Sequence, residues 1–301
     1  MFVATIRARL PVFGLALALF AGPVLAQNGK LLLTGGVSSI DGAAGGGLTP
    51  WALTGSYATT EQLGGTAFAT RVKTRDYALN AVGVAAAYHD RLEVSLAHQN
   101  FDTGPAGPAL GLPGLRLRQD IIGLKVRVFG EAVLDSDMLV PQLAVGLEWK
   151  SAHPGGLAAT LDSLGARRHG TDVYLSATKL LLARGVLINA TLRATQANQN
   201  GLLGFGGASH DSCSLQPEVS LAWLLNRHVA IGAEYRAKPD NLNPSALGAG
   251  LREDDWSDVF IAWAPTKHVS VTLAAVDLGH IVPGVVTRRQ RGAYLSVQVA
   301  F

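Results

Sequence analysis

Apolar and polar residues alternate with period two along most of the chain after Leu48, and the alternating segments are joined by links of alternating length. Between residues 139 and 150, for example, Leu143 and Leu147 share one face of an extended strand, and Glu148 and Lys150 share the other. A half-buried strand of a soluble β-sandwich alternates in the same way. The alternation therefore predicts an all-β fold, and the links must decide between a sandwich and a barrel.

About twelve segments have this character, an even number, as in bacterial outer-membrane barrels. They span residues 48–58, 77–88, 92–101, 121–129, 139–150, 172–182, 186–196, 215–225, 229–238, 255–264, 269–278 and 293–301. The first link is long, the second is short, and the alternation continues to the last link. Outer-membrane barrels have short periplasmic turns and long external loops. We therefore predict a transmembrane antiparallel up-and-down β-barrel of about twelve strands.

The C-terminal residues support the barrel independently. Ala293, Leu295, Val297, Val299 and the terminal Phe301 lie on one face of the last predicted strand. This series resembles the terminal strand that the barrel-assembly machinery recognises, in which an aromatic last residue ends an alternating apolar series. We expect Phe301 to be the assembly signal and the assembly machinery to be a partner during biogenesis.

The N-terminus has the features of a secretory signal peptide. Arg7 and Arg9 are basic, an apolar stretch follows from Val12 to Leu19, and small residues precede the end of the segment at Ala26. The apolar stretch is shorter than the ~20 residues that a spanning helix needs, which argues against an uncleaved anchor. We predict cleavage after Ala26 and localisation in the outer membrane of a Gram-negative cell, in contact with lipid and lipopolysaccharide.

Composition excludes several other classes. The predicted signal peptide holds two of the 25 basic residues and none of the 22 acidic ones, so 23 basic and 22 acidic residues remain, a balance of +1. This gives no electrostatic reason to expect a nucleic-acid partner. Charged residues make up 16% of the chain, against about 25% in soluble domains. Apolar runs after the signal are too short for a transmembrane helix, and the single Cys213 forms no intrachain disulfide.

The predicted domain organisation has three parts: a signal peptide over residues 1–26, a Gly-rich segment over 27–47 and the barrel over 48–301. Residues Gly42 to Gly47 lack the Lys-Ser/Thr continuation of a phosphate-binding loop. Because this segment precedes the first predicted strand, we expect that it can lie in the lumen as a partial plug.

A charge on the lipid face of a barrel costs about 2 to 4 kcal/mol near the midplane, so charged strand residues are expected to face the lumen. If Leu225 pairs with Val229, then Glu218 lies opposite Arg236, and Glu234 lies beside Ser220. The other candidates for the inner wall are Lys125, Arg127, Glu148, Lys150, Lys179, Asn189, Arg193 and Asp258. Mixed charges allow either a water-filled path or a lumen closed by salt bridges.

Aromatic residues near predicted strand ends indicate the interfacial girdles of a membrane barrel. This set comprises Trp51, Tyr88, Trp149, Trp223, Trp256 and Trp263. Ordinary core aromatics are the alternative explanation. Two further irregularities predict local departures from the strand pattern: Pro141 and Pro217 lie inside alternating runs, and the apolar register slips between residues 116 and 122, where we expect a bulge or a shorter strand.

Several segments together resemble an uncharacterised proteobacterial family catalogued as domain of unknown function 3034. They are GKLLLTGGV at 29–37, GGGLTPW at 45–51, LPGLRLRQD at 112–120, LRATQANQNGLLGFGG at 192–207, AEYRAKPDNL at 233–242 and DDW at 254–256. The resemblance covers nearly the whole mature chain. It implies an exported barrel-like membrane protein, and it implies no catalytic residue.

Signals for chemistry are weak. Barrel-type lipid hydrolases pair a His with a Ser two positions on, as in His210/Ser212 and His268/Ser270, but no third orienting group is identifiable. The eight His residues form no metal-ligand cluster, and no cofactor is implied. Three functions remain open: a narrow pore or facilitator for small polar solutes, a non-conducting barrel that binds partners through its external loops, and, with least support, a lipid-modifying enzyme.

Overall fold

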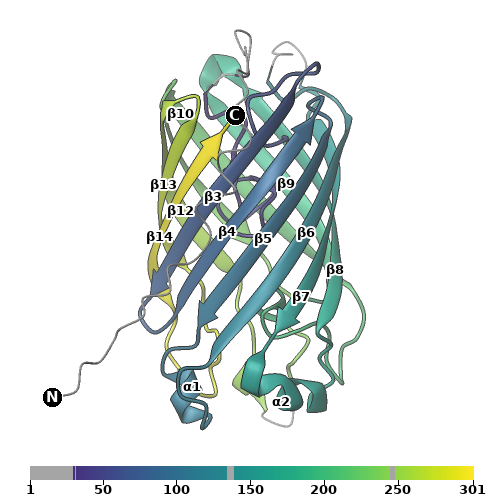
Figure 1. Cartoon of the computed structure of the whole chain (residues 1–301), viewed down its shortest axis with the longest axis vertical. Coiled ribbons are helices and arrows are strands. Elements are labelled where there is room, and N and C mark those ends of the chain that lie inside the picture. The colour runs from purple at the N-terminus through teal and green to yellow at the C-terminus, as the bar shows by residue number, and fades with distance from the viewer. Residues whose placement is uncertain (1–29, 31, 134–138, 245–247) are drawn as a thin grey trace, which may run out of the picture.

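The computed structural model of the 301-residue chain describes residues 30, 32–133, 139–244 and 248–301. Its main feature is a closed barrel of twelve antiparallel strands, β3 to β14, in which every strand pairs with its neighbour in sequence (Figure 1). The barrel closes where β14 pairs with β3, with Tyr294 opposite Val72. The predicted up-and-down topology and the strand number are therefore confirmed. The predicted signal peptide lies outside the described residues.

The strands are β3 (Leu63–Thr74), β4 (Ala78–Tyr88), β5 (Leu92–Asp102), β6 (Arg116–Phe129), β7 (Gln142–His153), β8 (His169–Leu181), β9 (Val186–Thr195), β10 (Ser214–Asn226), β11 (Val229–Arg236), β12 (Trp256–Thr266), β13 (Val269–Asp277) and β14 (Arg291–Ala300). Side chains alternate between the barrel interior and the outside along them. The outward face is rich in exposed aliphatic residues, such as Val82, Leu124, Leu147 and Leu221. This is the apolar band that a barrel presents to lipid.

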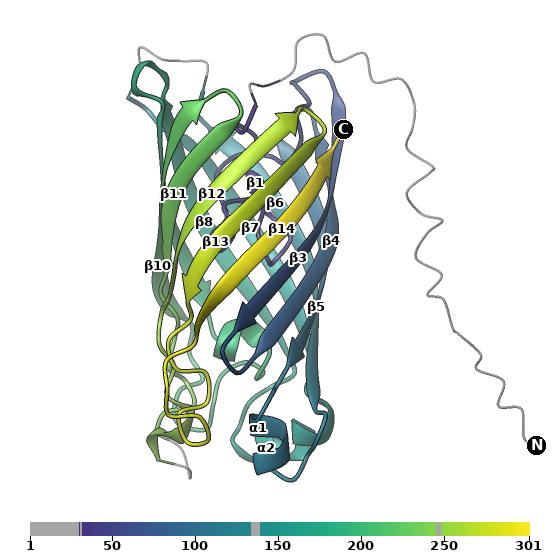
Figure 2. The same ribbon diagram turned by 90° about the vertical axis from the view of Figure 1, so that its left-hand side faces the viewer.

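The two ends of the barrel differ. Short turns and the C-terminus lie at one end, and longer loops with helices α1 (Ala106–Ala109) and α2 (Ala158–Ser163) lie at the other (Figure 2). The longer loops also hold the 3₁₀ turns η1 (Gly155–Leu157), η3 (Asn198–Gly201) and η4 (Ala249–Leu251), and η2 (Leu182–Arg184) forms a turn at the opposite end. Among the residues that the structure describes, no helix is long and apolar enough to span a membrane.

The first strand is not the predicted one. Residues 48–58 lie inside the barrel, and β3 is the first strand of the wall. The first connection at the long-loop end, between β3 and β4, is therefore only residues 75–77. Arg71 and Lys73 interrupt the apolar series on the outward face of β3, so the sequence pattern does not reveal this strand. Both residues lie near the end of the strand, where a charge that faces lipid costs less. The barrel domain therefore starts near Leu63 and not at Leu48.

Both irregularities of the sequence pattern have a structural explanation. β7 begins at Gln142, just after Pro141. Pro217 pairs with Leu192 of β9 and lies just beyond the last pair between β10 and β11, Glu218 opposite Arg236. The expected bulge between residues 116 and 122 is wrong, because β5 and β6 pair there without a shift. Leu117 and Ile121 face inward, so the inner wall is itself apolar near the long-loop end.

Candidate functional site: the plugged lumen

The barrel interior holds an N-terminal segment, residues 32–58, which we call the plug (Figure 1). It folds back on itself through the strand pair β1 (Val37–Ser38) and β2 (Ala44–Gly45), with Val37 opposite Gly45. Nearly all of its side chains are buried. The lumen is therefore filled by a separate stretch of chain and not by the side chains of the wall alone.

The wall binds the plug largely through the plug's backbone. Gln142 Nε2 donates to the Ala52 carbonyl at 2.5 Å, and Ala52 N–H donates to Thr178 Oγ1 at 2.8 Å. Asn189 Nδ2 and Thr191 Oγ1 both donate to the Pro50 carbonyl. Because buried backbone groups need partners, these polar side chains satisfy a segment that has little regular structure of its own.

Two buried acidic residues of the wall bind the plug at different points along its length. Glu93 accepts hydrogen bonds from the backbone N–H groups of Ala44 and Gly55, and it pairs with Lys125 at 3.0 Å. Lys125 Nζ donates in turn to the Ala44 carbonyl at 2.8 Å.

The second acidic residue, Glu234, accepts from Leu48 N–H at 2.8 Å and from Thr49 Oγ1 at 2.6 Å. Ser220 Oγ also donates to Glu234, at 2.8 Å, and contacts Thr49 Oγ1 at 2.5 Å. Asp258 lies opposite Glu234 on β12. The plug turn thus rests on an acidic patch of the wall.

The tip of the plug carries Asp41, which joins the wall to an inward-folded loop. Asp41 Oδ2 accepts from Arg236 Nη1 at 2.7 Å and lies 3.7 Å from Lys150 Nζ. Asp41 Oδ1 accepts from Asn200 Nδ2 at 2.7 Å. Asn200 Oδ1 accepts from both Lys150 and Arg236, at 2.9 and 2.8 Å. We call these four residues the latch.

A network of wall charges surrounds the latch. Arg193 pairs with Glu218 at 2.6 Å and with Glu148 at 2.7 Å, and its guanidinium lies over the Tyr174 ring at 5.1 Å. Asp172 contacts Lys150 at 2.9 Å. The wall thus contributes three cations, Lys150, Arg193 and Arg236, and three anions, Glu148, Asp172 and Glu218. These wall charges balance without Asp41.

The loop that carries Asn200 closes the lumen from the long-loop end. Gln199 and Asn200 have φ angles of 45° and 60°, in the left-handed region that Asn tolerates better than most residues. Glu253 accepts from Gln199 N–H at 2.8 Å and pairs with Lys238 at 3.3 Å. Burial raises the pKa of Glu253 to about 7, although the neighbouring Lys238 opposes the shift, and burial lowers the pKa of Lys238.

At the short-turn end, Asp90 holds the point where the plug enters. Its carboxylate contacts Lys30 at 2.5 Å, Arg127 at 2.8 Å and Thr54 Oγ1 at 2.5 Å. Arg127 is half-buried. The plug is therefore fastened at the short-turn end, along the wall and at its tip.

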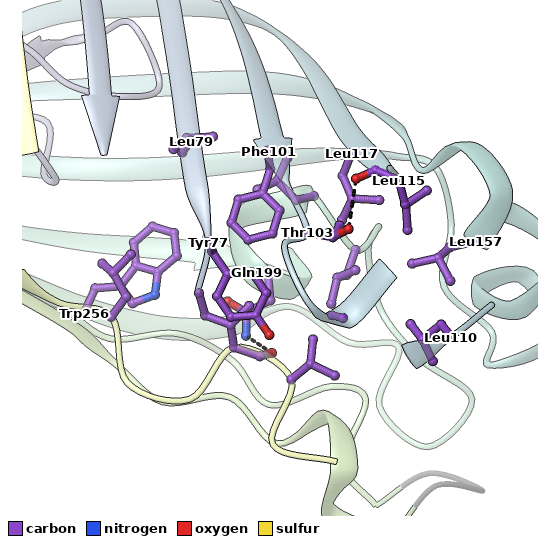
Figure 3. A pocket seen from close by; sticks show the side chains of 16 residues that line it. Tyr77, Leu79, Phe101, Thr103, Leu110, Leu115, Leu117, Leu157, Gln199 and Trp256 are labelled. Atoms are coloured by element: carbon purple, nitrogen blue, oxygen red, sulfur yellow. Dashed lines mark hydrogen bonds between the residues drawn. The ribbon is translucent and has the colours of Figure 1, made fainter. Parts of the chain in front are cut away.

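An apolar chamber lies among the loops at the long-loop end of the barrel (Figure 3). It has a volume of about 60 Å³ and is lined almost entirely by aliphatic and aromatic side chains. Tyr77 and Phe101 stack with ring centroids 5.4 Å apart. Burial raises the pKa of Tyr77 to about 12, so its hydroxyl stays protonated. Gln199 of the closing loop forms part of the lining.

The structure places most lumen candidates together. Lys125, Glu148, Lys150, Lys179, Asn189, Arg193, Glu218, Glu234, Arg236 and Asp258 are buried in the barrel interior. The predicted register of Glu218 opposite Arg236 is confirmed. Sequence analysis missed Asp41, Asn200, Glu93 and Asp172. Asp41 is the only charged residue between positions 31 and 60, which is a signal that could have singled it out.

The aromatic set divides into two groups. Tyr88, Trp149, Trp223 and Trp263 are exposed on the outer surface. Trp51 and Trp256 are buried, which makes their assignment to the girdle wrong. Trp51 belongs to the plug, and its Nε1 donates to Ser220 Oγ at 2.9 Å. Trp256 lies two positions before Asp258 on β12, so both side chains face inward. The Trp256 ring lies 4.6 Å from Lys238 Nζ.

Neither His/Ser pair forms a recognisable catalytic arrangement. His268 Nδ1 contacts the Ala300 carbonyl at 2.9 Å, which fixes its ring against β14, and His210 is exposed in the loop before β10. Among the residues that the structure describes, no group of three His, Cys, Asp or Glu side chains is arranged to hold a metal ion. Cys213 is exposed.

The fold is that of outer-membrane porins. The KdgM porin in complex with disordered oligogalacturonate matches with a TM-score of 0.50 and 8% identity, over 78% of this chain and 99% of that chain. The NanC porin matches with a TM-score of 0.49 and 6% identity, over 78% of this chain and 98% of that chain. The COG4313 outer membrane channel from Pseudomonas putida F1 matches with a TM-score of 0.46 and 11% identity, over 81% of this chain and 96% of that chain.

No curated protein sequence matches the chain. The model of one protein family matches residues 34–298, a range that begins within the plug and ends two residues before the end of β14. The plug and the barrel are therefore both part of what the family has in common, and the chain belongs to the DUF3034 family, described as proteins of unknown function.

Proposed function

We propose that this protein is an outer-membrane channel for small polar solutes in which the plug is the gate. The observation that carries the proposal is that a separate, tethered segment fills the lumen, while the wall around the latch is polar and charged. A wall that served only as a structural core would be apolar, because buried ion pairs stabilise a fold less than well-packed apolar residues do. A polar wall is required where solutes and water pass.

The charge balance of the wall supports withdrawal of the plug. Lys150, Arg193 and Arg236 already have Glu148, Asp172 and Glu218 as wall partners, at distances between 2.6 and 3.3 Å. When Asp41 leaves, these wall charges still pair with one another, and water replaces the remaining contacts. The plug can therefore leave without stranding an isolated charge, which is the costly event in a protein interior.

The outward aliphatic band contacts lipid and lipopolysaccharide, and residues 1–26 direct export and are cleaved. The short turns face the periplasm and the longer loops face outward, as in other outer-membrane barrels. Phe301 serves as the signal for the barrel-assembly machinery. The plug then enters from the periplasmic side.

A reversible crosslink tests the gate. In a Cys213→Ser background, Thr49→Cys and Ser220→Cys replace two side chains whose oxygen atoms lie 2.5 Å apart, close to the ~2.05 Å of a disulfide. We expect the oxidised protein to give no conductance steps in a planar bilayer. Reduction should restore the steps of the Cys213→Ser protein, and the Thr49→Cys variant alone should not respond to oxidation.

Two results would refute the proposal. Equal conductance of the oxidised and reduced proteins would show that the plug is not the gate. Absence of steps from every reduced, folded variant would exclude a channel and favour a non-conducting barrel that acts through its loops. Folding of each variant is checked by the heat-dependent mobility of the barrel on a denaturing gel.

A further inference from the structure

The apolar chamber at the long-loop end has properties that the gate does not require. Its lining comes from six separate parts of the chain: the β3–β4 turn with the start of β4, the β5–β6 loop with α1, the η1 turn, the η3 loop, the start of β12 and the loop after β13. Figure 3 shows Trp256 on one side of it and Leu110 and Leu157 on the other. Leu110 is 46% exposed, so the chamber reaches the surface of the external loops.

The chamber offers almost no polar contact to an occupant. Thr103 Oγ1 donates to the Leu115 carbonyl at 2.9 Å, and Gln199 Nε2 donates to the Ile281 carbonyl at 3.0 Å, so the Thr103 hydroxyl hydrogen and one of the two Gln199 N–H groups are already used. Lys238 Nζ donates to Gln199 Oε1 at 2.9 Å. An ionic or strongly polar molecule would lose its hydration here without replacement. The chamber therefore selects against such molecules.

Two hydrogen-bond donors of the lining have no partner among the described residues. They are the Tyr77 hydroxyl and the Trp256 indole N–H, and both side chains are more than nine-tenths buried. Buried Tyr and Trp side chains usually find an acceptor for these groups. Each of these two groups can therefore donate to an oxygen atom of a ligand in the chamber.

We propose that the chamber binds a small neutral molecule that is mostly hydrocarbon and carries a hydrogen-bond acceptor, to which the Tyr77 hydroxyl or the Trp256 indole N–H donates. The volume of about 60 Å³ is less than half of the roughly 150 Å³ that holds benzene in an engineered protein cavity. A single ring therefore enters only with movement of the exposed Leu110 at the mouth. This site goes beyond the proposed channel, and its binding does not depend on conduction.

The chamber can be filled by one substitution. Ala106 on α1 is buried and lines the chamber, whereas Ala109 on the same helix is exposed. We test the full mature chain in nanodiscs with cyclohexanone, which has one carbonyl acceptor, and with benzene, which has none. Saturable binding is measured by ligand-observed nuclear magnetic resonance. Partition into lipid is the same for every variant, so it cancels in the comparison.

We expect Ala106→Leu to weaken binding of both probes at least tenfold and the matched Ala109→Leu to leave binding unchanged. The double variant Tyr77→Phe/Trp256→Phe should weaken cyclohexanone binding relative to benzene binding by about threefold to tenfold, as loss of a hydrogen bond predicts. Absence of saturable binding to the unaltered chain, or equal binding to Ala106→Leu and Ala109→Leu, would overturn the site.

The donor variants keep the proposal testable if Ala106→Leu does not fold. An equal loss of both probes in the double variant would overturn the assignment of Tyr77 and Trp256 as the polar contact. The channel proposal is unaffected by either outcome, because the crosslink experiment measures conductance and these measurements read binding alone.

Discussion

Asp41→Asn is the substitution that should weaken the plug most selectively. The variant keeps the shape of the side chain and removes the only charge of the plug. It weakens the 2.7 Å contact with Arg236 and the 3.7 Å contact with Lys150, while the wall network of Arg193, Glu148 and Glu218 stays intact. The barrel should therefore fold normally while the docked state of the plug loses stability.

The size of the effect follows from the burial of the latch. Asp41 is 1% exposed and accepts hydrogen bonds from Arg236 and Asn200; a hydrogen bond to a charged group contributes about 1.5 to 3 kcal/mol, so the two together contribute about 3 to 6 kcal/mol. The asparagine oxygen still accepts a hydrogen bond from Arg236, and Lys150 keeps Asp172 as a partner. We therefore expect the lower end, about 3 kcal/mol, which lowers the ratio of docked to withdrawn plug by about a hundredfold.

A buried plug residue reports this ratio. Ser39 is buried and its hydroxyl has no hydrogen-bond partner among the described residues, so Ser39→Cys in a Cys213→Ser background places a thiol that reacts only when the plug leaves. When plug motion is fast relative to labelling, the rate of reaction with a membrane-impermeant maleimide follows the withdrawn population. Asp41→Asn should raise this rate by about a hundredfold.

Asp162→Asn is the matched control, because Asp162 forms an exposed pair with Arg168 on the outer loops and such pairs contribute little. It should leave the labelling rate unchanged. Equal rates in Asp41→Asn and Asp162→Asn would refute the view that the latch holds the plug.

Three further expectations follow from the same contacts. Arg193→Met should destabilise the barrel by about 3 to 5 kcal/mol in urea unfolding, because it leaves Glu148 and Glu218 buried without their main partner; Arg168→Met, on the surface, should have little effect. Gly45→Ala should raise Ser39→Cys labelling, because a Cβ atom there would overlap the Thr49 carbonyl oxygen. A Cβ atom on Gly65 would make only an ordinary contact, so Gly65→Ala should not; unchanged labelling in Gly45→Ala would contradict the plug turn. The loop around Gln199 should open more readily as pH rises: the pKa of Glu253, about 7, is above its ordinary value of 4.5, so its contribution is fully present below about pH 4.5 and is lost as pH rises through about 7. Hydrogen exchange at Gln199, corrected for intrinsic rates, measures this opening, and Glu253→Gln should remove its dependence on pH.

The wall could be predicted from the sequence because strand periodicity and link length report it directly. Side chains along each strand face lipid and lumen in turn, so the alternation alone places Glu218, Arg236 and Lys150 inside. The same rule would have found Glu93 and Asp172, whose neighbours Val94 and Val173 face outward. It also shows why Trp256 is not a girdle residue, since Trp256 and Asp258 share a face.

The plug and the chamber could not be predicted in this way, because neither has a repeating pattern. The sequence pattern predicts a strand over residues 48–58, but in the structure Leu48, Trp51 and Leu53 face the wall from inside the barrel. The chamber is assembled from loops that are distant in sequence, and only the closed barrel places Tyr77 and Trp256 in the lining of one chamber. Such contacts form only when the barrel closes, and the local sequence pattern does not predict them.

The composition of the plug is consistent with a segment that docks and withdraws. Gly46 lies so close to the Glu234 carboxylate that a Cβ atom would overlap it, and Gly45 allows the close turn against Thr49. The wall therefore recognises plug backbone more than plug side chains, through Gln142, Thr178 and Glu93. These polar groups would be hydrated when the plug leaves, so the same side chains that hold the closed state also provide a hydrophilic surface for the open one.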